Sequence, residues 1–269
     1  MRLPPGLDKL EELLQASGPA AIAVSGGVDS MTLVHVALRA MHPLGVKPVL
    51  FHAVSPAVPV DATGRVRRHA EREGWDLRCV DAGELQDARY LANPVNRCYF
   101  CKTNLYDHIR RAWSGPLFSG TNLDDLSDYR PGLIAAQEHQ VRHPFVEAGM
   151  AKAGVRAIAT YLGLHDLATL PAQPCLSSRI ETGIAIDPAH LRMIDRVETH
   201  LRDLLGPGDL RCRLRCDGLH VEVDSALFAN LDQSMTRMIK ESVLAAAHDS
   251  GLTFSGLSPY VRGSAFIKA

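Results

Sequence analysis

Apolar and polar positions along the first part of the chain form blocks that predict a repeated strand–helix order. A run of small apolar residues over 20–24 ends at a glycine pair, which is typical of a buried parallel strand. Apolar residues at helical spacing then predict a helix over 29–41. Further strands are predicted at 46–54 and 76–80, with a helix over 60–73 between them. The alternation predicts a doubly wound α/β fold with a parallel sheet.

The pattern continues and then changes its character. A helix over 102–112 and a strand over 116–119 extend the α/β order. A long helix is predicted over 188–205, and the segment after it alternates as an antiparallel strand does. We therefore expect two domains, an α/β domain over 1–180 and a smaller α+β domain over 181–269.

The alternating segment 210–216 predicts a strand with two distinct faces. One face carries three arginines, which are Arg211, Arg213 and Arg215. Asp217-Gly218 is a favoured two-residue turn, so a hairpin is predicted here. The return strand would then pair Arg213 with Glu222 and Arg215 with His220 on the arginine face.

Composition narrows the class of protein. The 269 residues are 46% hydrophobic and 22% charged, which is enough apolar material for a folded core and excludes disorder. With 29 basic and 30 acidic side chains, binding to nucleic acid through bulk charge is not expected. No apolar run reaches the ~18–20 residues of a membrane span, and the N-terminus lacks the apolar core of a signal peptide. Six cysteines without a secretion signal predict reduced thiols and a cytoplasmic protein.

The most informative motif is Ser25-Gly-Gly-Val-Asp-Ser30, between the predicted first strand and its helix. Glycines allow close backbone approach, and a helix N-terminus offers unpaired N–H groups to a phosphate. The motif has no lysine, so it is not of the Walker A type. It resembles the PP-loop of ATP pyrophosphatases, in which Asp29 would help to hold Mg²⁺ on the phosphates. The alternative is an ordinary glycine turn at a strand end.

A second polar segment, 119–132, follows the strand predicted at 116–119. It crowds four carboxylate or amide side chains into seven residues, namely Asn122, Asp124, Asp125 and Asp128. Ligands bind at the carboxyl ends of strands in open parallel sheets, which favours a role in binding. An ordinary acidic loop is the alternative.

Three cysteines lie in contexts that suggest chemistry. Cys98 and Cys101 have the C-x-x-C spacing that lets two thiolates reach one metal or cluster, and they open a helix. Cys175 follows a proline and precedes Ser177, Ser178 and Arg179. Buried structural cysteines are the alternative interpretation.

These motifs, in their order and spacing, resemble the LarE family over about residues 18–225. LarE proteins are ATP-dependent sulfur transferases of nickel-pincer nucleotide cofactor synthesis, and their substrate is a pyridinium carboxylate mononucleotide. The resemblance implies that ATP adenylates a carboxylate and that a cysteine matching Cys175 attacks the acyl adenylate. It also implies a homo-oligomer, with substrate binding and assembly assigned to the smaller domain.

The resemblance implies a set of site residues. ATP would be bound by Ser25, Gly26, Gly27, Asp29, Ser30, Thr121 and Asn122. The substrate would be bound by Arg179, Arg211, Arg213, Asp128 and Arg130. Mg²⁺ would be held by Asp29, Asp125, Glu198 and Glu222. For Glu198 the alternative is a solvated helix face. The chain departs from the family at His220, where arginine is common, and at Cys216, where glycine is usual.

The source of the sulfur has two interpretations. Members that sacrifice one cysteine lack the Cys98–Cys101 pair. The three-cysteine version resembles a branch that binds a [4Fe–4S] cluster through Cys98, Cys101 and Cys175, which leaves one iron open for an extra sulfide. We favour this cluster over sacrifice of Cys175.

Other interpretations remain open at this stage. A zinc site on Cys98, Cys101, Cys212 and Cys216 is disfavoured, because residues 212 and 216 lie about 13 Å apart on one strand. A PP-loop tRNA thiolase would need a basic surface. An amidating PP-loop ligase leaves the three cysteines unexplained, and a nucleotide-binding regulatory module would release no pyrophosphate.

Overall fold

The structure, a computed structural model, describes residues 3–127, 130–261 and 263–265. The chain folds into two units, and each is assembled from separated segments. Unit 1 consists of Met1–Ser55, Val60–Glu84 and Cys98–Gln173. Unit 2 consists of Pro56–Pro59, Leu85–Arg97 and Pro174–Ala269.

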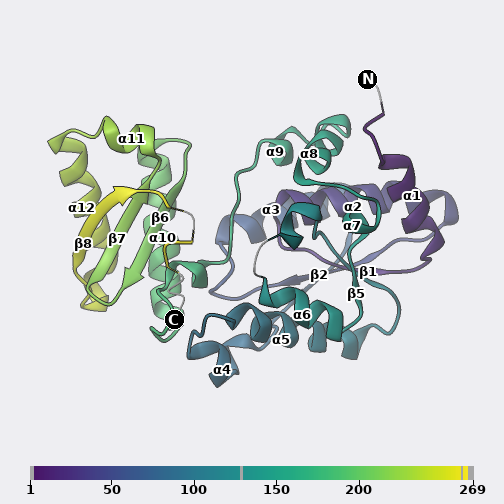
Figure 1. The fold of residues 1–269 in the computed structure, drawn as a ribbon, viewed down its shortest axis with the longest axis horizontal. Helices are drawn as coiled ribbons and strands as arrows, with labels where there is room; N and C mark the ends of the chain where they lie inside the picture. The colour runs from purple at the N-terminus through teal and green to yellow at the C-terminus, as the bar shows by residue number, and fades with distance from the viewer. Residues whose placement is uncertain (1–2, 128–129, 262, 266–269) are drawn as a thin grey trace. The chain divides into compact units, whose positions relative to one another are not determined.

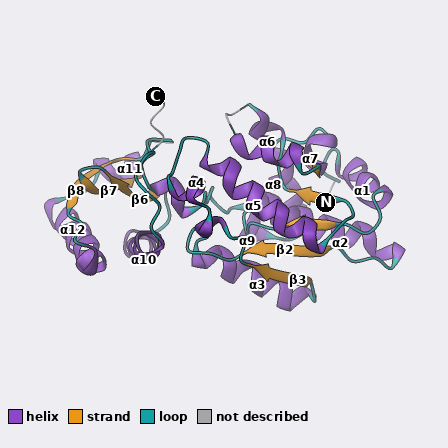
Figure 2. Ribbon diagram, turned by 90° about the horizontal axis from the view of Figure 1, so that it is seen from below, coloured by secondary structure: helices purple, strands orange, loops and turns teal. Residues whose placement is uncertain are grey.

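Unit 1 is built on a parallel five-stranded sheet (Figure 1). Its strands, in spatial order, are β3 (Asp76–Val80), β2 (Val49–Ala53), β1 (Ala21–Ala23), β4 (Leu117–Ser119) and β5 (Val141–Arg142). The pairs β1–β2, β1–β4, β2–β3 and β4–β5 are all parallel, as the aligned arrows of β2 and β3 illustrate in Figure 2. The strand order changes direction at β1, so the end of β1 lies where ligands bind in doubly wound sheets.

Helices cover both faces of this sheet (Figure 1). One face carries α1 (Leu7–Ala16), α2 (Val28–Met41), α3 (Val60–Glu73), α7 (Pro144–Glu147), α8 (Lys152–Tyr161) and α9 (His165–Ala168). The other face carries α5 (Arg97–Ala112) and α6 (Pro131–Glu138). The central strand supplies both cores, because Ile22 packs on the first face while Ala21 and Ala23 pack on the second. The predicted doubly wound α/β class is confirmed.

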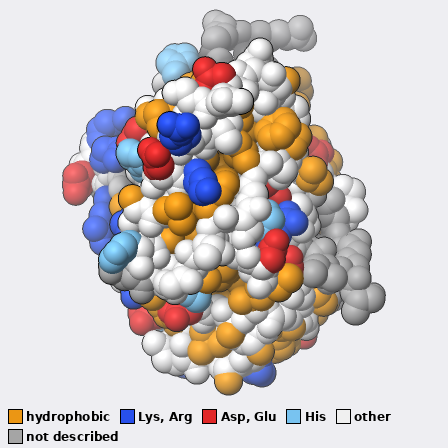
Figure 3. All heavy atoms as spheres, turned by 90° about the vertical axis from the view of Figure 1, so that its left-hand side faces the viewer, with side chains coloured by type: hydrophobic (Ala, Val, Ile, Leu, Met, Phe, Trp, Pro, Cys, Tyr) orange, Lys and Arg blue, Asp and Glu red, His pale blue; other side chains and the backbone are white. Residues whose placement is uncertain are grey.

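Unit 2 contains a mixed three-stranded sheet, β6 (Leu210–Arg215), β7 (Gly218–Val223) and β8 (Phe254–Pro259). β6 runs antiparallel to β7, whereas β8 runs parallel to it. The unit also holds α4 (Ala88–Leu91), α10 (Pro188–Leu205), α11 (Ser225–Ala229) and α12 (Gln233–Ala247). On the face of unit 2 drawn in Figure 3, basic, acidic and apolar side chains are interspersed.

Two short segments join unit 2 although they precede its main part by many residues. Tyr90 contacts the hydroxyl of Ser177 at 2.5 Å, and the Asn93 side chain donates to the carbonyls of Glu181 and Ile184 at 2.8 and 2.9 Å. Asn93 has a positive φ of 52° and is fully buried. Its amide therefore holds the turn that follows the Cys175 segment.

The hairpin register differs from the prediction. Arg213 lies opposite His220, Arg211 opposite Glu222 and Arg215 opposite Gly218, so the turn is Cys216-Asp217. Both expected cross-strand pairings, Arg213 with Glu222 and Arg215 with His220, were wrong. Gly218 belongs to β7 through its pairing with Arg215, and Thr253 and Ser255 fill the space that a Cβ atom would occupy there.

Several predicted bounds agree with the structure, including the helices over 60–73 and 188–205 and the strand over 76–80. α5 instead begins at Arg97, five residues before the predicted start. Its first turn closes early because the Arg97 N–H donates to the Pro94 carbonyl at 3.0 Å. Among the described residues, no helix is long and apolar enough to cross a membrane.

Candidate functional site

The loop Ser25–Ser30 connects β1 to the N-terminus of α2, as predicted. Gly26 adopts φ +82°, and a Cβ atom there would lie 2.7 Å from the Ala62 carbonyl oxygen. The Ser30 hydroxyl accepts from the Ser25 N–H at 3.1 Å and donates to the Gly27 carbonyl at 3.2 Å. The loop is therefore a hydrogen-bonded turn, and at its two glycines a bound phosphate can approach the backbone closely.

The end of β4 packs directly against this loop. A Cβ atom on Gly120 would lie 2.6 Å from the Ser30 backbone nitrogen, so only glycine allows this approach. Thr121 and Asn122 come directly after Gly120 in the sequence. The Ser119 hydroxyl lies 3.1 Å from the Thr121 hydroxyl and 2.8 Å from a ring nitrogen of His143. The predicted ATP-binding residues of both loops thus lie at one edge of the unit 1 sheet.

Asp29 is the centre of a small polar cluster at this edge. One carboxylate oxygen accepts from the Asn122 side chain at 3.2 Å, and the other accepts from the Lys152 ammonium at 2.5 Å. The Lys152 backbone N–H in turn donates to Asp124 at 3.1 Å. The side chains of Asp29 and Lys152 are 23% and 32% exposed, so both are accessible to a ligand.

Lys152 is a candidate functional residue that the sequence analysis missed. It begins α8, far along the chain from the loop, and no motif marks it. A second missed residue is Arg65 of α3, whose guanidinium is buried and donates to the Gly26 carbonyl at 2.7 Å. Neither could be found from spacing, because each reaches the loop only through tertiary packing.

Most of the acidic segment after β4 has local hydrogen-bonding partners. Asn122 and Asp125 form a capping box on the short helix Leu123–Leu126, and Asp125 also pairs with Arg130 at 2.8 Å. Asp128, a predicted substrate ligand, lies outside the described residues. The crowding of acids that suggested a binding loop is therefore satisfied in part by helix capping and an ion pair.

The candidate cysteines lie on two elements. Cys98 and Cys101 occupy the first turns of α5 in unit 1, and Cys175 precedes the short helix Leu176–Arg179 of unit 2. All three are partly buried. Among the described residues, no group of three or more His, Cys, Asp or Glu side chains is gathered for a metal ion.

The other cysteines are not arranged for joint chemistry. Cys212 is fully buried on β6, and burial raises the pKa of its thiol well above the ordinary range, with the Glu198 carboxylate adding to the effect. Cys79 and Cys216 are exposed. Cys212 is therefore a structural residue of the unit 2 core.

Arg179 and Glu198 form a buried ion pair in unit 2, with side-chain exposures of 1% and 0%. Glu198 accepts two bonds from Arg179, a third from Arg202, and a fourth from the Cys212 N–H. Burial alone would raise the pKa of Glu198, but the charge and hydrogen bonds of Arg179, together with Arg202 and the Cys212 N–H, lower that pKa overall. The carboxylate predicted as a Mg²⁺ ligand is thus surrounded by donors.

The same arginine face of unit 2 holds Glu222. Arg213 and Arg215 pair with it at 3.0 and 2.9 Å, and Ser264 donates to it at 2.5 Å. Arg213 also donates to the Ser178 carbonyl at 2.9 Å. Arg211 is 5% exposed, and its guanidinium lies over the Tyr260 ring at 5.1 Å.

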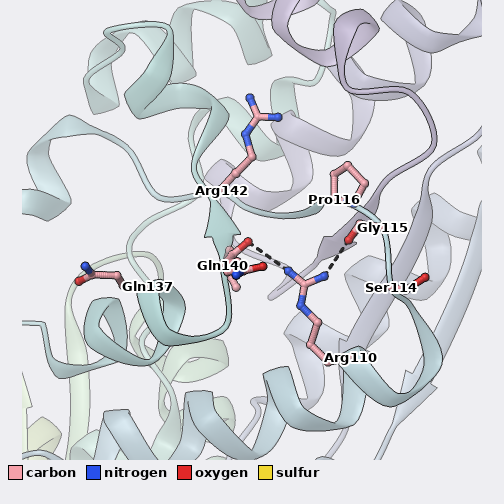
Figure 4. A pocket seen from close by; sticks show the side chains of 8 residues that line it. Arg110, Ser114, Gly115, Pro116, Gln137, Gln140 and Arg142 are labelled. Atoms are coloured by element: carbon pink, nitrogen blue, oxygen red, sulfur yellow. Dashed lines mark hydrogen bonds between the residues drawn. The ribbon is translucent and has the colours of Figure 1, made fainter.

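A cavity of about 530 Å³ opens at the opposite edge of the unit 1 sheet (Figure 4). It lies beside Gly115 and Pro116, which precede β4, and beside Gln140 and Val141 at the start of β5. Arg110 donates to the carbonyls of Gly115 (2.7 Å), His139 (2.8 and 3.1 Å) and Gln140 (3.1 Å). Its guanidinium thus ties two connecting loops together, at the edge of the sheet away from the loop Ser25–Ser30.

The glycine loop between a parallel strand and a helix, with its aspartate and without a Walker lysine, places unit 1 in the PP-loop class of α/β folds. No family model matches the chain. An uncharacterized Synechocystis protein, slr1717, is 40% identical over 212 residues, which cover 76% of this chain and 77% of that protein. The chain therefore belongs to the same family as this uncharacterized protein.

Two further relatives are more distant in sequence. The pyridinium-3,5-bisthiocarboxylic acid mononucleotide synthase of Lactiplantibacillus plantarum is 28% identical over 209 residues, which cover 76% of this chain and 74% of that enzyme. The uncharacterized protein MJ0830 of Methanocaldococcus jannaschii is 24% identical over 234 residues, covering 86% of this chain and 85% of that protein.

Proposed function

We propose that the protein is an ATP-dependent sulfurtransferase of nickel-pincer cofactor synthesis. Its substrate would be a pyridinium-3,5-dicarboxylate mononucleotide, of which one carboxylate becomes a thiocarboxylate. The observation that carries the proposal is the phosphate-binding loop with Asp29 and Lys152 at one sheet edge, in a chain related to a named thiocarboxylate synthase.

The first step is adenylation of the carboxylate. A carboxylate oxygen attacks the α-phosphorus of ATP, the bond to the β-phosphate breaks, and pyrophosphate leaves. Backbone N–H groups at the start of α2 and the hydroxyls of Ser25 and Ser30 would donate to the phosphates. The Lys152 ammonium would neutralise charge on the leaving pyrophosphate. The Asp29 carboxylate would bind the Mg²⁺ that accompanies ATP, and its ion pair with Lys152 would weaken as it does so.

The second step moves sulfur to the activated carbon. A thiolate is a strong nucleophile and AMP is a good leaving group, so Cys175 sulfur attacks the acyl carbon and AMP departs. The thioester then yields a thiocarboxylate when the Cβ–S bond of Cys175 breaks and its Cα proton passes to solvent. Dehydroalanine remains at position 175, so one chain would serve one sulfur transfer.

The anionic groups of the substrate would be bound on the arginine face of unit 2. Arg211 and Arg213 are the arginines that the family resemblance assigns to this role, and a guanidinium suits both carboxylate and phosphate. Glu222 already occupies Arg213 and Arg215. A bound anion must therefore compete with Glu222 for Arg213 and Arg215.

A [4Fe–4S] cluster, the source favoured by the sequence, is the second candidate for the sulfur. The first turns of α5 hold Cys98 and Cys101 at i and i+3, which suits two ligands of one cluster. The third ligand, Cys175, belongs to unit 2, so the described residues fit the cluster in part. When bound, the cluster would supply a replaceable sulfide in place of the Cys175 sulfur.

The proposal is tested with purified protein, ATP, Mg²⁺ and the dicarboxylate mononucleotide. We expect release of pyrophosphate that depends on the mononucleotide, together with a thiocarboxylate product detected by mass spectrometry. The variant Asp29→Asn should lose both, whereas Lys9→Met, at an exposed position of α1, should lose neither. Absence of pyrophosphate release, or formation of thionucleosides in bulk tRNA instead, would overturn the proposal.

The sulfur source requires a separate measurement. Anaerobic purification followed by iron and acid-labile sulfide analysis should give about four of each per chain if the cluster is present, and Cys98→Ala should remove them. Intact mass after turnover should instead show loss of the elements of H₂S if Cys175 is sacrificed. A colourless protein with that mass change would exclude the cluster as donor.

A further inference from the structure

Arg65 connects the phosphate-binding loop to the last residue of unit 1. Its guanidinium donates to the Gly26 carbonyl at 2.7 Å and to the Gln173 side-chain oxygen at 3.2 Å. The residue is 8% exposed and lies on α3, whose Ala62 carbonyl packs against Gly26. A single buried side chain thus bonds two segments that are far apart in the sequence.

The bond to Gly26 couples Arg65 to the orientation of one peptide group of the loop. Because a peptide group is planar, holding the Gly26 carbonyl also sets the direction of the Gly27 N–H. That N–H makes only a long contact of 3.4 Å with the Ser25 hydroxyl. It is therefore suited to turn toward a phosphate, and any such turn would be felt at the Gly26 carbonyl and at Arg65.

The bond to Gln173 acts on the chain that leads to Cys175. Gln173 is followed by Pro174 and then by Cys175. A residue that precedes proline has few allowed backbone conformations, so the orientation of Gln173 restricts the direction of the chain after it. Both acceptors of Arg65 in these bonds are uncharged, a main-chain carbonyl and a side-chain amide.

We propose that Arg65 and Gln173 are positioning residues that link occupancy of the phosphate-binding loop to the segment carrying Cys175. The inference rests on the proposed function, because such a link would couple adenylation to sulfur transfer. ATP at the loop orders the Gly26 peptide, Arg65 follows it, and the Gln173 segment becomes fixed. Sulfur transfer is thereby favoured when an adenylated substrate is present.

Hydrogen exchange measures this link without requiring sulfur transfer. A non-hydrolysable ATP analogue with Mg²⁺ should slow exchange in peptides covering 24–30 and also in those covering 168–176. In Gln173→Leu, which removes the acceptor at similar size, protection of 24–30 should remain while protection of 168–176 falls by about tenfold. Gln173→Glu restores an acceptor and should restore the protection.

Turnover gives the second readout. Gln173→Leu should keep the rate of pyrophosphate release within about twofold, but its yield of thiocarboxylate per pyrophosphate should fall about tenfold. Gln173→Glu should recover that yield. The control Arg67→Leu lies at an exposed position of α3, the helix that carries Arg65. It should change neither the rate of pyrophosphate release nor the yield of thiocarboxylate.

The outcomes separate the inference from the proposed function. If the analogue protects 24–30 but leaves 168–176 unchanged in the native protein, the link is overturned while ATP binding stands. Equal protection of 168–176 in the native protein and in Gln173→Leu also overturns it. No protection of 24–30 would instead contradict the ATP-binding role on which the proposed function depends.

Discussion

Arg179 holds the backbone at Cys175 and is itself held by Glu198. Two bonds of 2.8 and 2.9 Å join its guanidinium to the carboxylate, and the remaining nitrogen donates to the carbonyls of Pro174 and Cys175 at 2.7 and 3.2 Å. The Ser178 hydroxyl adds a bond to the Cys175 carbonyl at 2.7 Å. The buried pair therefore orients the candidate sulfur-donor segment, and the Arg179 donors are largely used within the protein.

Removing one member of this pair should destabilise the protein strongly. Arg179→Met leaves the Glu198 carboxylate buried with Arg202 as its remaining cationic partner, so the free energy of unfolding should fall by about 3–5 kcal/mol. Urea denaturation measures the change. The double variant Arg179→Met/Glu198→Leu should recover much of the loss, because no buried charge then lacks its partner. A double variant as unstable as the single one would contradict this account.

Gly26 and Gly18 provide a matched comparison for the phosphate-binding loop. Both have positive φ, +82° and +65°, but only Gly26 has a backbone atom where a Cβ would lie. Gly26→Ala should therefore abolish ATP-dependent pyrophosphate release, because the loop must move away from α3. Gly18→Ala should cost only about 1 kcal/mol of stability and leave that activity intact. Retained activity in Gly26→Ala would show that the loop tolerates displacement.

Lys152 should matter for ATP chemistry although it lies outside the loop. Lys152→Met removes the cation that pairs with Asp29, so pyrophosphate release should slow by about 10²-fold, as for loss of other electrostatic contacts to a reacting phosphate. Steady-state kinetics with varied ATP would show whether KM, kcat or both change. An unchanged kcat/KM for ATP would restrict Lys152 to a structural role.

His35 should make stability depend on pH in mild acid. Burial, together with the His69 ring 3.0 Å away, lowers the pKa of His35 from 6.5 to about 4. Between these values the unfolded chain binds a proton that the folded chain does not. Stability is therefore complete above pH 6.5 and falls as the pH drops toward 4, by up to about 3 kcal/mol.

The variant His35→Gln removes this titration. The difference in unfolding free energy between pH 7 and pH 4.5 should therefore be smaller in His35→Gln than in the native protein, as urea denaturation at the two pH values would show. His42→Gln, at an exposed position just after α2, serves as the control and should retain the native difference. If the unfolding free energy changed equally between the two pH values in all three proteins, the pH dependence could not be attributed to His35.

Local pattern was sufficient for much of unit 1. The run over 20–24, its glycine pair and the following helix predicted the loop Ser25–Ser30 in its correct place, because each signal comes from neighbouring residues. The ends of β1 and β4 could also be expected to meet, since both are carboxyl ends of parallel strands. Asp29 and Asn122 were selected from such signals, and the structure brings the two side chains within 3.2 Å of each other.

Residues that depend on distant packing were not predictable. Lys152 and Arg65 reach the loop from α8 and α3, and nothing in their own neighbourhoods marks them. The hairpin failed for a similar reason, because Asp217-Gly218 is a good local turn. In the structure Gly218 instead pairs with Arg215 of β6, and Thr253 and Ser255, from near the end of the chain, pack against it.

The interrupted make-up of unit 2 sets an order for its formation during synthesis. Residues 56–59 and 85–97 leave the ribosome long before 174–186, which hold the partners of Tyr90 and Asn93. Unit 1 has all its segments once Gln173 has emerged, whereas unit 2 must wait for most of the chain. A fragment beginning at residue 174 would lack Tyr90 and Asn93, so unit 2 cannot be excised or transplanted as one continuous piece.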